Sequence, residues 1–196
     1  MLEACRTASR WDGIGVSVNV SPAQFRTGEF LPLVRRALQT SGLPARLLEL
    51  ELTEGVLLED TDRARETMRG LKALGVRLSI DDFGTGYSSL GYLRTFPFDT
   101  IKIDRQFIAD LHPAGDARAI VQAILGLGHA LGMSVTAEGV ETDEQLLLLQ
   151  SDQCEEVQGY LMSRPLSTQD ADLIVSTQKT RQAELAPAVG RAGQGG

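Results

Sequence analysis

The sequence predicts an α/β fold in which parallel β-strands alternate with α-helices. Two observations predict it directly. Short runs that are apolar, or that alternate between apolar and polar residues, recur along the chain, and amphipathic helical patterns fill the intervals between them. A third observation narrows the choice of architecture. No short-period repeat is present, which argues against a solenoid.

The predicted elements follow one another in regular order. The strand-like runs are IGVSVN at 14–19, LLELEL at 47–52, VRLSI at 76–80, TIKI at 100–103, MSVTA at 133–137 and EEVQ at 155–158. The helical patterns lie at 2–11, 29–41, 60–74, 116–131, 142–150 and 168–178, with a short helix expected after Ser88. From residue 179 to 196 the chain is rich in Ala, Gly and Pro, and it is predicted to be a disordered C-terminal tail.

Six strands fit either an open doubly wound sheet or a closed barrel. The first strand is not followed by the G-x-G-x-x-G pattern of dinucleotide-binding folds, and no G-x-x-x-x-G-K-[ST] phosphate loop occurs. The DFG at 82–84 lacks the H-R-D loop that accompanies it in protein kinases, so that similarity is accidental.

Composition limits the class of protein. The 196 residues are 42% hydrophobic with a net charge of −7, which suits one soluble globular domain and argues against binding to a nucleic-acid polymer. No apolar run is long enough to span a membrane and no signal peptide is seen, so a cytoplasmic protein without membrane contact is expected. The two cysteines, Cys5 and Cys154, are expected to be reduced.

Any metal ion would have oxygen ligands. The two histidines, His112 and His129, have no cysteine near them in sequence, which argues against a zinc site. Carboxylate and carbonyl oxygens are the ligands of magnesium, manganese and calcium.

A polar side chain capable of binding a cation, water or phosphate stands at the end of every predicted strand. These residues are Asn19, Glu51, Asp81, Asp82, Lys102, Glu138 and Gln158. In a parallel barrel all the carboxyl ends of the strands open on one face, where the active site is built. The alternation in LELEL also places Glu49 and Glu51 on the face opposite the leucines.

The adjacent acids Asp81 and Asp82 have two possible explanations. They can belong to an ordinary solvated turn before Gly84 and Gly86, or their mutual repulsion can be relieved by bound cations. The clustering of acids at one rim favours cations. Ordinary structural roles stay possible for the other residues: capping or helix starts for Asn19, Glu54, Glu138 and Glu141, and local pairing for Lys102 and Gln158.

Six motifs, in order, resemble the EAL-domain cyclic di-GMP phosphodiesterases. They are SVNVSPAQF (17–25), LELELTEG (48–55), IDDFGTGYSSLGYL (80–93), FDTIKIDRQFI (98–108), TAEGVET (136–142) and CEEVQGYLMSRP (154–165). The resemblance implies an EAL domain over 1–178 with a TIM-like (β/α) barrel fold. It also implies hydrolysis of cyclic di-GMP to linear pGpG with two Mg²⁺ or Mn²⁺ ions.

The same resemblance assigns roles to individual residues. Metal binding is implied for Asn19, Glu51, Asp81, Asp82 and Glu138. Lys102 would lie near the catalytic water, and Glu138 would also assist proton removal. The supporting positions are Glu54, Glu141 and Gln158, of which Glu54 would steady loop 82–89, a region that the family links to homodimer formation.

One departure from the family pattern concerns the motif that names it. No Glu-Ala-Leu tripeptide occurs, and only 18 residues precede Asn19. The barrel is therefore expected to be incomplete, with about six of eight strands and without one metal-binding glutamate. This leaves a second function open, a catalytically degenerate module that binds cyclic di-GMP or a protein partner in signalling.

Overall fold

The computed structural model describes residues 1–26, 28–56, 61–85 and 90–185. They divide into two units, Met1–Arg164 and Pro165–Gly196. The first unit contains the whole sheet and the candidate site, and the second contains helix α9, Thr168–Leu185.

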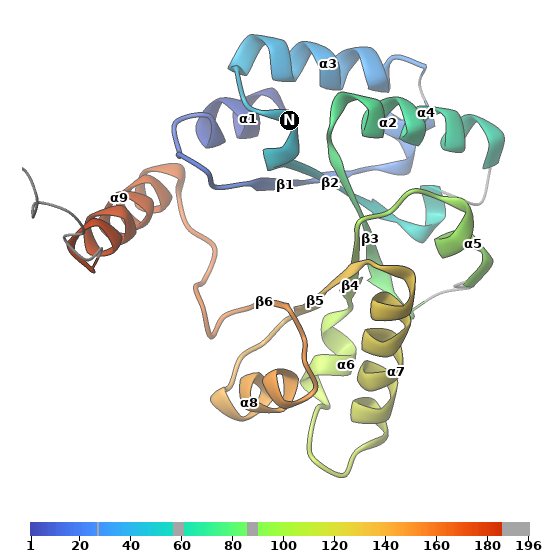
Figure 1. Ribbon diagram of the computed structural model, residues 1–196, viewed down its shortest axis with the longest axis vertical. Coiled ribbons are helices and arrows are strands. Elements are labelled where there is room, and N and C mark those ends of the chain that lie inside the picture. The colour runs from blue at the N-terminus through green and yellow to red at the C-terminus, as the bar shows by residue number, and fades with distance from the viewer. Residues whose placement is uncertain (27, 57–60, 86–89, 186–196) are drawn as a thin grey trace, which may run out of the picture. The chain divides into compact units, whose positions relative to one another are not determined.

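The six predicted strands are all present and form one parallel sheet in the order β1-β2-β3-β4-β5-β6 (Figure 1). The strands are β1 Val16–Val20, β2 Leu48–Thr53, β3 Arg77–Phe83, β4 Thr100–Ile103, β5 Ser134–Glu138 and β6 Glu156–Gln158. Each strand pairs with the strand that precedes it in the chain, whereas a doubly wound sheet reverses direction at a switch point. The fold is therefore an incomplete TIM-like α/β barrel, a half-barrel of six strands.

Helices connect the strands of the first unit. They are α1 Leu2–Ala8, α2 Pro22–Arg26, α3 Phe30–Ser41, α4 Thr61–Leu74, α5 Leu90–Thr95, α6 Arg105–Ala109, α7 Asp116–Leu131 and α8 Asp143–Ser151. Two 3-10 turns, η1 Ala45–Leu47 and η2 Glu54–Val56, flank β2. The longer helices agree with the predicted ranges, and α5 is the short helix expected after Ser88.

The sheet separates apolar from polar side chains by the alternation within each strand. Leu48, Leu50 and Leu52 of β2 are fully buried in the hydrophobic core, and Glu49 and Glu51 between them occupy the opposite face. Burial of the leucines fixes the register of the strand, because a slip of one residue would move them to the polar face. The face with the acids is the one that builds the site.

Strand β3 departs from the predicted boundary at the paired acids. We expected it to end at Ile80 and the chain to turn with the help of Gly84 and Gly86. Instead β3 continues to Phe83, and its register with β4 shifts between Ile80 and Phe83, as in a β-bulge. Asp82, which lies within this shift, has a left-handed φ of 54°, a conformation that aspartate tolerates better than most residues.

Two short helices were missing from the sequence prediction. Helix α2 follows Ser21, whose hydroxyl accepts a hydrogen bond from Gln24 N, and α6 follows Asp104, whose carboxylate accepts one from Gln106 N. Each helix is little more than one turn long, so it shows no amphipathic period. The capping residues were the only local signal.

The C-terminal unit also differs from the prediction. Helix α9 continues to Leu185, so residues 179–185, expected to belong to the disordered tail, are helical. The rest of the predicted tail, 186–196, lies outside the described residues. Among the helices of the described ranges, none has the length and apolar content needed to cross a bilayer.

Candidate active site

The ammonium group of Lys102 lies among carboxylates from three other strands. Its Nζ is 2.6 Å from Oε1 of Glu51, 2.5 Å from Oε1 of Glu138 and 3.7 Å from Oδ1 of Asp81. The lysine side chain is only 5% exposed. A buried ammonium is stable only when it is paired, and three acids here provide the pairing.

The pairing of the strands explains why these residues meet. Asp81 is in register with Thr53, two residues beyond Glu51, so Glu51 and Asp81 point to the same face. Lys102 is in register with Thr136, two residues before Glu138, so these two residues share a face as well. All four side chains lie in the half of their strands nearer the carboxyl end, as predicted.

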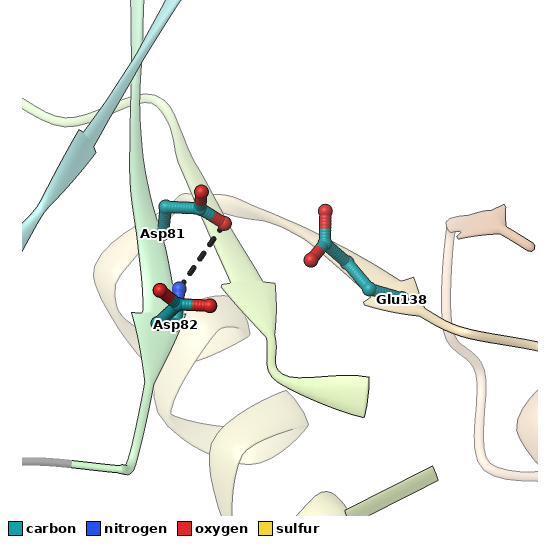
Figure 2. A group of neighbouring side chains, drawn as sticks. All are labelled: Asp81, Asp82 and Glu138. Carbon is teal, nitrogen blue, oxygen red and sulfur yellow. Dashed lines mark hydrogen bonds between the residues drawn. The ribbon is translucent and has the colours of Figure 1, made fainter. Parts of the chain in front are cut away.

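A second grouping contains three carboxylates. One oxygen each from Asp81, Asp82 and Glu138 lies within 4.8 Å of the others. The backbone N–H of Asp82 donates to Oδ1 of Asp81 at 3.1 Å, and Glu138 extends from β5 toward the two aspartates (Figure 2). The bulge thus allows both neighbouring aspartates to contribute, which a regular strand would prevent.

Burial and charge shift the pKa values of the central pair. Burial alone would lower the pKa of Lys102, but hydrogen bonds to Glu138 and Glu51 outweigh it and raise the pKa above the usual lysine value. Burial raises the pKa of Glu138, while its hydrogen bond to Lys102 acts in the opposite direction. The lysine therefore keeps its positive charge, and Glu138 is a better proton acceptor than an exposed glutamate.

Asp104 lies near the site but was not among the predicted site residues. Lys102 pairs with Glu51 and Glu138, and Asp104 affects the pKa of Asp82. The pKa of Asp82 is raised first by burial, then by the charge of Asp81, and further by Asp104. An acid two residues after a strand-end lysine was the signal that could have identified it.

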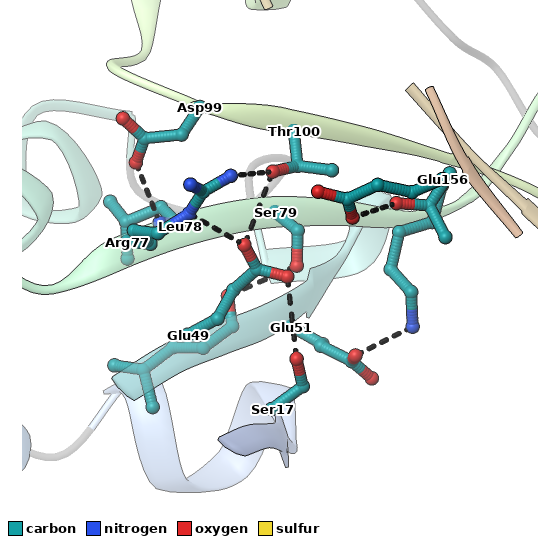
Figure 3. A network of polar contacts seen from close by, with 12 residues as sticks. Ser17, Glu49, Glu51, Arg77, Leu78, Ser79, Asp99, Thr100 and Glu156 are labelled. Carbon is teal, nitrogen blue, oxygen red and sulfur yellow. Dashed lines mark hydrogen bonds and ion pairs between the residues drawn. The ribbon is translucent and has the colours of Figure 1, made fainter. Parts of the chain in front are cut away.

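Glu49 belongs to a separate polar layer nearer the amino ends of the strands. Its Oε2 accepts hydrogen bonds from Arg77 Nε and Thr100 Oγ1, both at 3.1 Å, and its Oε1 accepts one from Ser17 Oγ at 3.4 Å (Figure 3). Arg77 also donates to Thr100. Glu49 thus has a structural role, whereas Glu51 belongs to the site.

The remaining predicted residues lie around this cluster. Asn19 is in register with Glu51, and Gln158 is in register with Glu138. Within the described ranges, the side chains of Asn19, Glu141 and Gln158 make no hydrogen bond or ion pair with the cluster, and all three are exposed. Their proposed roles stay predictions.

The predicted dimer contact falls largely on residues that are not described. Glu54 begins the 3-10 turn η2, directly after β2. Its expected partner is loop 82–89, of which residues 86–89 lie outside the described ranges. The homodimer stays a prediction as well.

The donor set fits a hard divalent cation. The grouped ligand atoms are all carboxylate oxygens, and the two histidines are not among them. Magnesium, manganese and calcium prefer such ligands, whereas structural zinc sites use cysteine and histidine. The sequence-based choice of an oxygen-ligated metal is therefore consistent with the geometry.

Comparison with known proteins gives a family match over most of the chain. Residues 1–165 match the family described as EAL domain. The chain is 50% identical over 163 residues to an uncharacterized signaling protein of Caulobacter vibrioides, covering 83% of this chain and 20% of that protein. It is 48% identical over 151 residues to the cyclic di-GMP phosphodiesterase NbdA of Pseudomonas aeruginosa, covering 77% of this chain and 19% of NbdA.

Solved structures share the fold. The EAL domain of Mycobacterium smegmatis DcpA has a TM-score of 0.85 at 38% identity, with 90% of this chain and 82% of that chain covered. The PaMucR phosphodiesterase in complex with c-di-GMP has a TM-score of 0.82 at 42% identity, with 87% and 71% covered. A manganese and cy-diGMP complex of Klebsiella pneumoniae BlrP1 has a TM-score of 0.78 at 32% identity, with 85% and 43% covered. The chain spans about a fifth of the length of the curated relatives it matches.

Proposed function

Because the chain belongs to the EAL-domain family, we propose that it binds cyclic di-GMP and hydrolyses one of its phosphodiester bonds to give linear pGpG. The observation that carries the proposal is the position of Lys102 within hydrogen-bonding distance of Glu51 and Glu138. The lysine ammonium can contact an anionic phosphate, and the carboxylates around it can bind divalent cations. NbdA, by its name, acts on this nucleotide, and PaMucR was solved with it.

The proposed cofactors are two Mg²⁺ or Mn²⁺ ions. Asp81, Asp82 and Glu138 would hold them, with Glu51 and Asn19 as further ligands. When bound, such ions polarise a phosphate and lower the pKa of the attacking water.

The protein groups would divide the remaining work. Lys102 keeps its charge at neutral pH because its pKa is raised, so it would orient the attacking water beside the phosphate. Glu138, with a raised pKa, would accept the proton that this water loses. The water oxygen then bonds to phosphorus, the bond from phosphorus to one ribose oxygen breaks, and that oxygen takes up a proton.

A second candidate function is binding of cyclic di-GMP without hydrolysis. One observation favours it: the Lys102 ammonium already pairs with Glu51 and Glu138, two of the proposed metal ligands. A metal ion must compete with the lysine for these carboxylates. A site that holds the nucleotide but binds its metal ions weakly would position the reacting water poorly.

Incubation with cyclic di-GMP and Mg²⁺ or Mn²⁺ separates the two functions. We expect pGpG to accumulate, as measured by reversed-phase chromatography, and the nucleotide to bind in calorimetry with Ca²⁺ in place of the other metals. Glu138→Gln removes the proposed proton acceptor, and Glu155→Gln is the matched control. Glu155 pairs with His129 and not with Lys102.

The outcomes are distinct. Formation of pGpG by the parent chain and by Glu155→Gln, with loss of at least a hundredfold in Glu138→Gln, supports hydrolysis. Nucleotide binding without pGpG supports the second function. Absence of both binding and product contradicts both.

A further inference from the structure

Gln145 stands at the third position of α8, the helix that follows β5 and Glu138, and is only 9% exposed. It completes a capping box with Thr142: its backbone N–H donates to Thr142 Oγ1 at 3.2 Å, and its Oε1 accepts from Thr142 N at 3.1 Å. The same Oε1 accepts a further bond from Glu141 N at 2.8 Å. Both backbone amides belong to the loop that follows Glu138.

The amide nitrogen of Gln145 reaches a different part of the fold. Its Nε2 donates to the carbonyl oxygen of Ile108 at 2.9 Å. Ile108 lies in α6, which begins three residues after Lys102. A single buried side chain therefore joins the segment after Lys102 to the segment after Glu138.

The hydrogen bond to Ile108 explains why residue 145 is glutamine. Glutamate serves equally well at the third position of a capping box, since the box needs only an acceptor. The bond to Ile108 needs a donor, which a carboxylate lacks. The capping of α8 alone therefore does not account for glutamine at this buried position.

Backbone contacts also hold the loop between Glu138 and α8, both toward β6 and toward α6. Val140 N donates to Gln158 O, and Leu161 N donates to Val140 O, both at 3.0 Å. Gly139, with φ of 75°, passes so close to Arg105 that a Cβ would lie 2.5 Å from the Arg105 Cβ. Gln145 provides the side-chain hydrogen bond that joins this loop to α6.

We propose that Gln145 is a positioning residue, which holds the loop after Glu138 against α6 and so keeps the Glu138 carboxylate beside Lys102. The inference rests on the proposed function, because it concerns the same pair of residues. Groups that hydrogen-bond a metal ligand directly typically change metal affinity or activity by about 10- to 100-fold when they are replaced, and Gln145, which acts through the backbone, is expected at the lower end of that range.

The test compares Gln145→Glu with Gln145→Met. Gln145→Glu keeps the acceptor for Glu141 and Thr142 but loses the donor to Ile108. Gln145→Met loses every side-chain hydrogen bond. Gln122→Met is the matched control, since Gln122 donates to Asp152, and Asp152 pairs with Arg118 and not with Lys102. Three quantities are measured: the melting temperature, the dissociation constant for Mn²⁺ without nucleotide, and kcat and KM for pGpG formation.

If Gln145 positions Glu138, Gln145→Glu loses about tenfold in Mn²⁺ affinity and in kcat, with KM little changed, although its cap is intact. Gln122→Met keeps the Mn²⁺ affinity, kcat and KM of the parent chain, and any effect is confined to the melting temperature. If Gln145 only caps α8, Gln145→Glu equals the parent chain and only Gln145→Met is impaired, and that result would overturn the inference.

Failure of the proposed function is recognised separately. A parent chain that binds Mn²⁺ but makes no pGpG contradicts hydrolysis, while the Mn²⁺ affinities of the two Gln145 variants still decide the role of this residue. A parent chain that makes pGpG with Gln145→Glu fully active contradicts the positioning role alone. A parent chain that binds no Mn²⁺ contradicts both.

Discussion

Lys102 Nζ lies 2.5 Å from Oε1 of Glu138, although the two residues belong to different strands, β4 and β5. The same ammonium contacts Glu51 of β2 at 2.6 Å. A protein cation thus already neutralises part of the acidic cluster. A metal ion that binds must therefore share the carboxylates with Lys102.

Lys102→Met tests how strongly this cation supports the fold. Removing it leaves the buried Glu51 and the partly buried Glu138 without their cation, so the metal-free chain should lose about 3–5 kcal/mol in the free energy of unfolding. Urea denaturation in the presence of a chelator measures the loss. Lys72→Met is the matched control, because the ion pair of Lys72 with Asp99 is partly exposed and its loss should cost about 1 kcal/mol. Equal losses in the two variants would contradict a central role for Lys102.

Asp82→Asn tests the proposed metal site. The pKa of Asp82 is raised, so its ionised form is disfavoured in the folded state. The folded state is therefore destabilised as the pH rises above about 3.9, the usual pKa of an aspartate. Asparagine removes that charge and accepts the left-handed φ of 54° at this position. We expect the metal-free variant to be at least as stable as the parent at pH 7, with Mn²⁺ affinity reduced at least tenfold.

Asp81→Asn is the comparison for that experiment. It should lose Mn²⁺ affinity as well, but it should also destabilise the metal-free chain, because Asp81 lies 3.7 Å from Lys102 and accepts the Asp82 amide. Calorimetric titration and thermal unfolding with a chelator measure the two effects. Unchanged Mn²⁺ affinity in both variants would exclude this pair as metal ligands.

Much of this arrangement could be predicted from the sequence because it follows from strand alternation. The six strands and the convergence of Glu51, Asp81, Lys102 and Glu138 needed only the rule that parallel strands bring their carboxyl ends to one edge. The bulge at Asp82 could not be predicted, since an Asp-Asp-Phe-Gly stretch is equally typical of a turn.

The contacts that depend on tertiary structure were also invisible in the sequence. Gln145 looks like an ordinary helix-start residue, and only the folded chain places Ile108, 37 residues away, within reach of its amide. Asp104 lies next to a predicted strand end, but its influence on Asp82 depends on the bulge. Local patterns therefore specify which residues point toward the site, and packing specifies what supports them.

Two glycines of α7 should respond oppositely to replacement by alanine. Gly126 is exposed and has no atom within 4 Å of an added Cβ, so Gly126→Ala should stabilise the chain by about 0.5–1 kcal/mol through higher helix propensity. Gly128 is buried, and its added Cβ would lie 2.3 Å from Cγ2 of Val135 on β5.

Because valine is stiff about χ1, Gly128→Ala should destabilise the chain by about 1–3 kcal/mol. Thermal or urea unfolding of the two variants measures both signs. A stabilising Gly128→Ala would mean that α7 packs less closely on β5 than the structure shows.

The pair formed by Arg118 and Asp152 should make stability depend on acidic pH. Arg118 Nε and Nη2 lie 2.9 Å and 2.8 Å from the two oxygens of Asp152. This hydrogen bonding with Arg118, rather than burial, lowers the pKa of Asp152 below its usual value. A depressed folded-state pKa contributes stability that is fully present above the unfolded-state pKa of about 3.9 and is lost as the pH falls through the folded-state pKa.

Asp152→Asn should therefore melt at a lower temperature than the parent at pH 7, and the difference should shrink as the pH falls below about 3.9. Asp62→Asn serves as the control, since Asp62 is 94% exposed in its pair with Arg65 and should give little difference at any pH. If the difference in melting temperature between Asp152→Asn and the parent stays constant from pH 7 down to the lowest pH measured, the Asp152 charge does not contribute to stability.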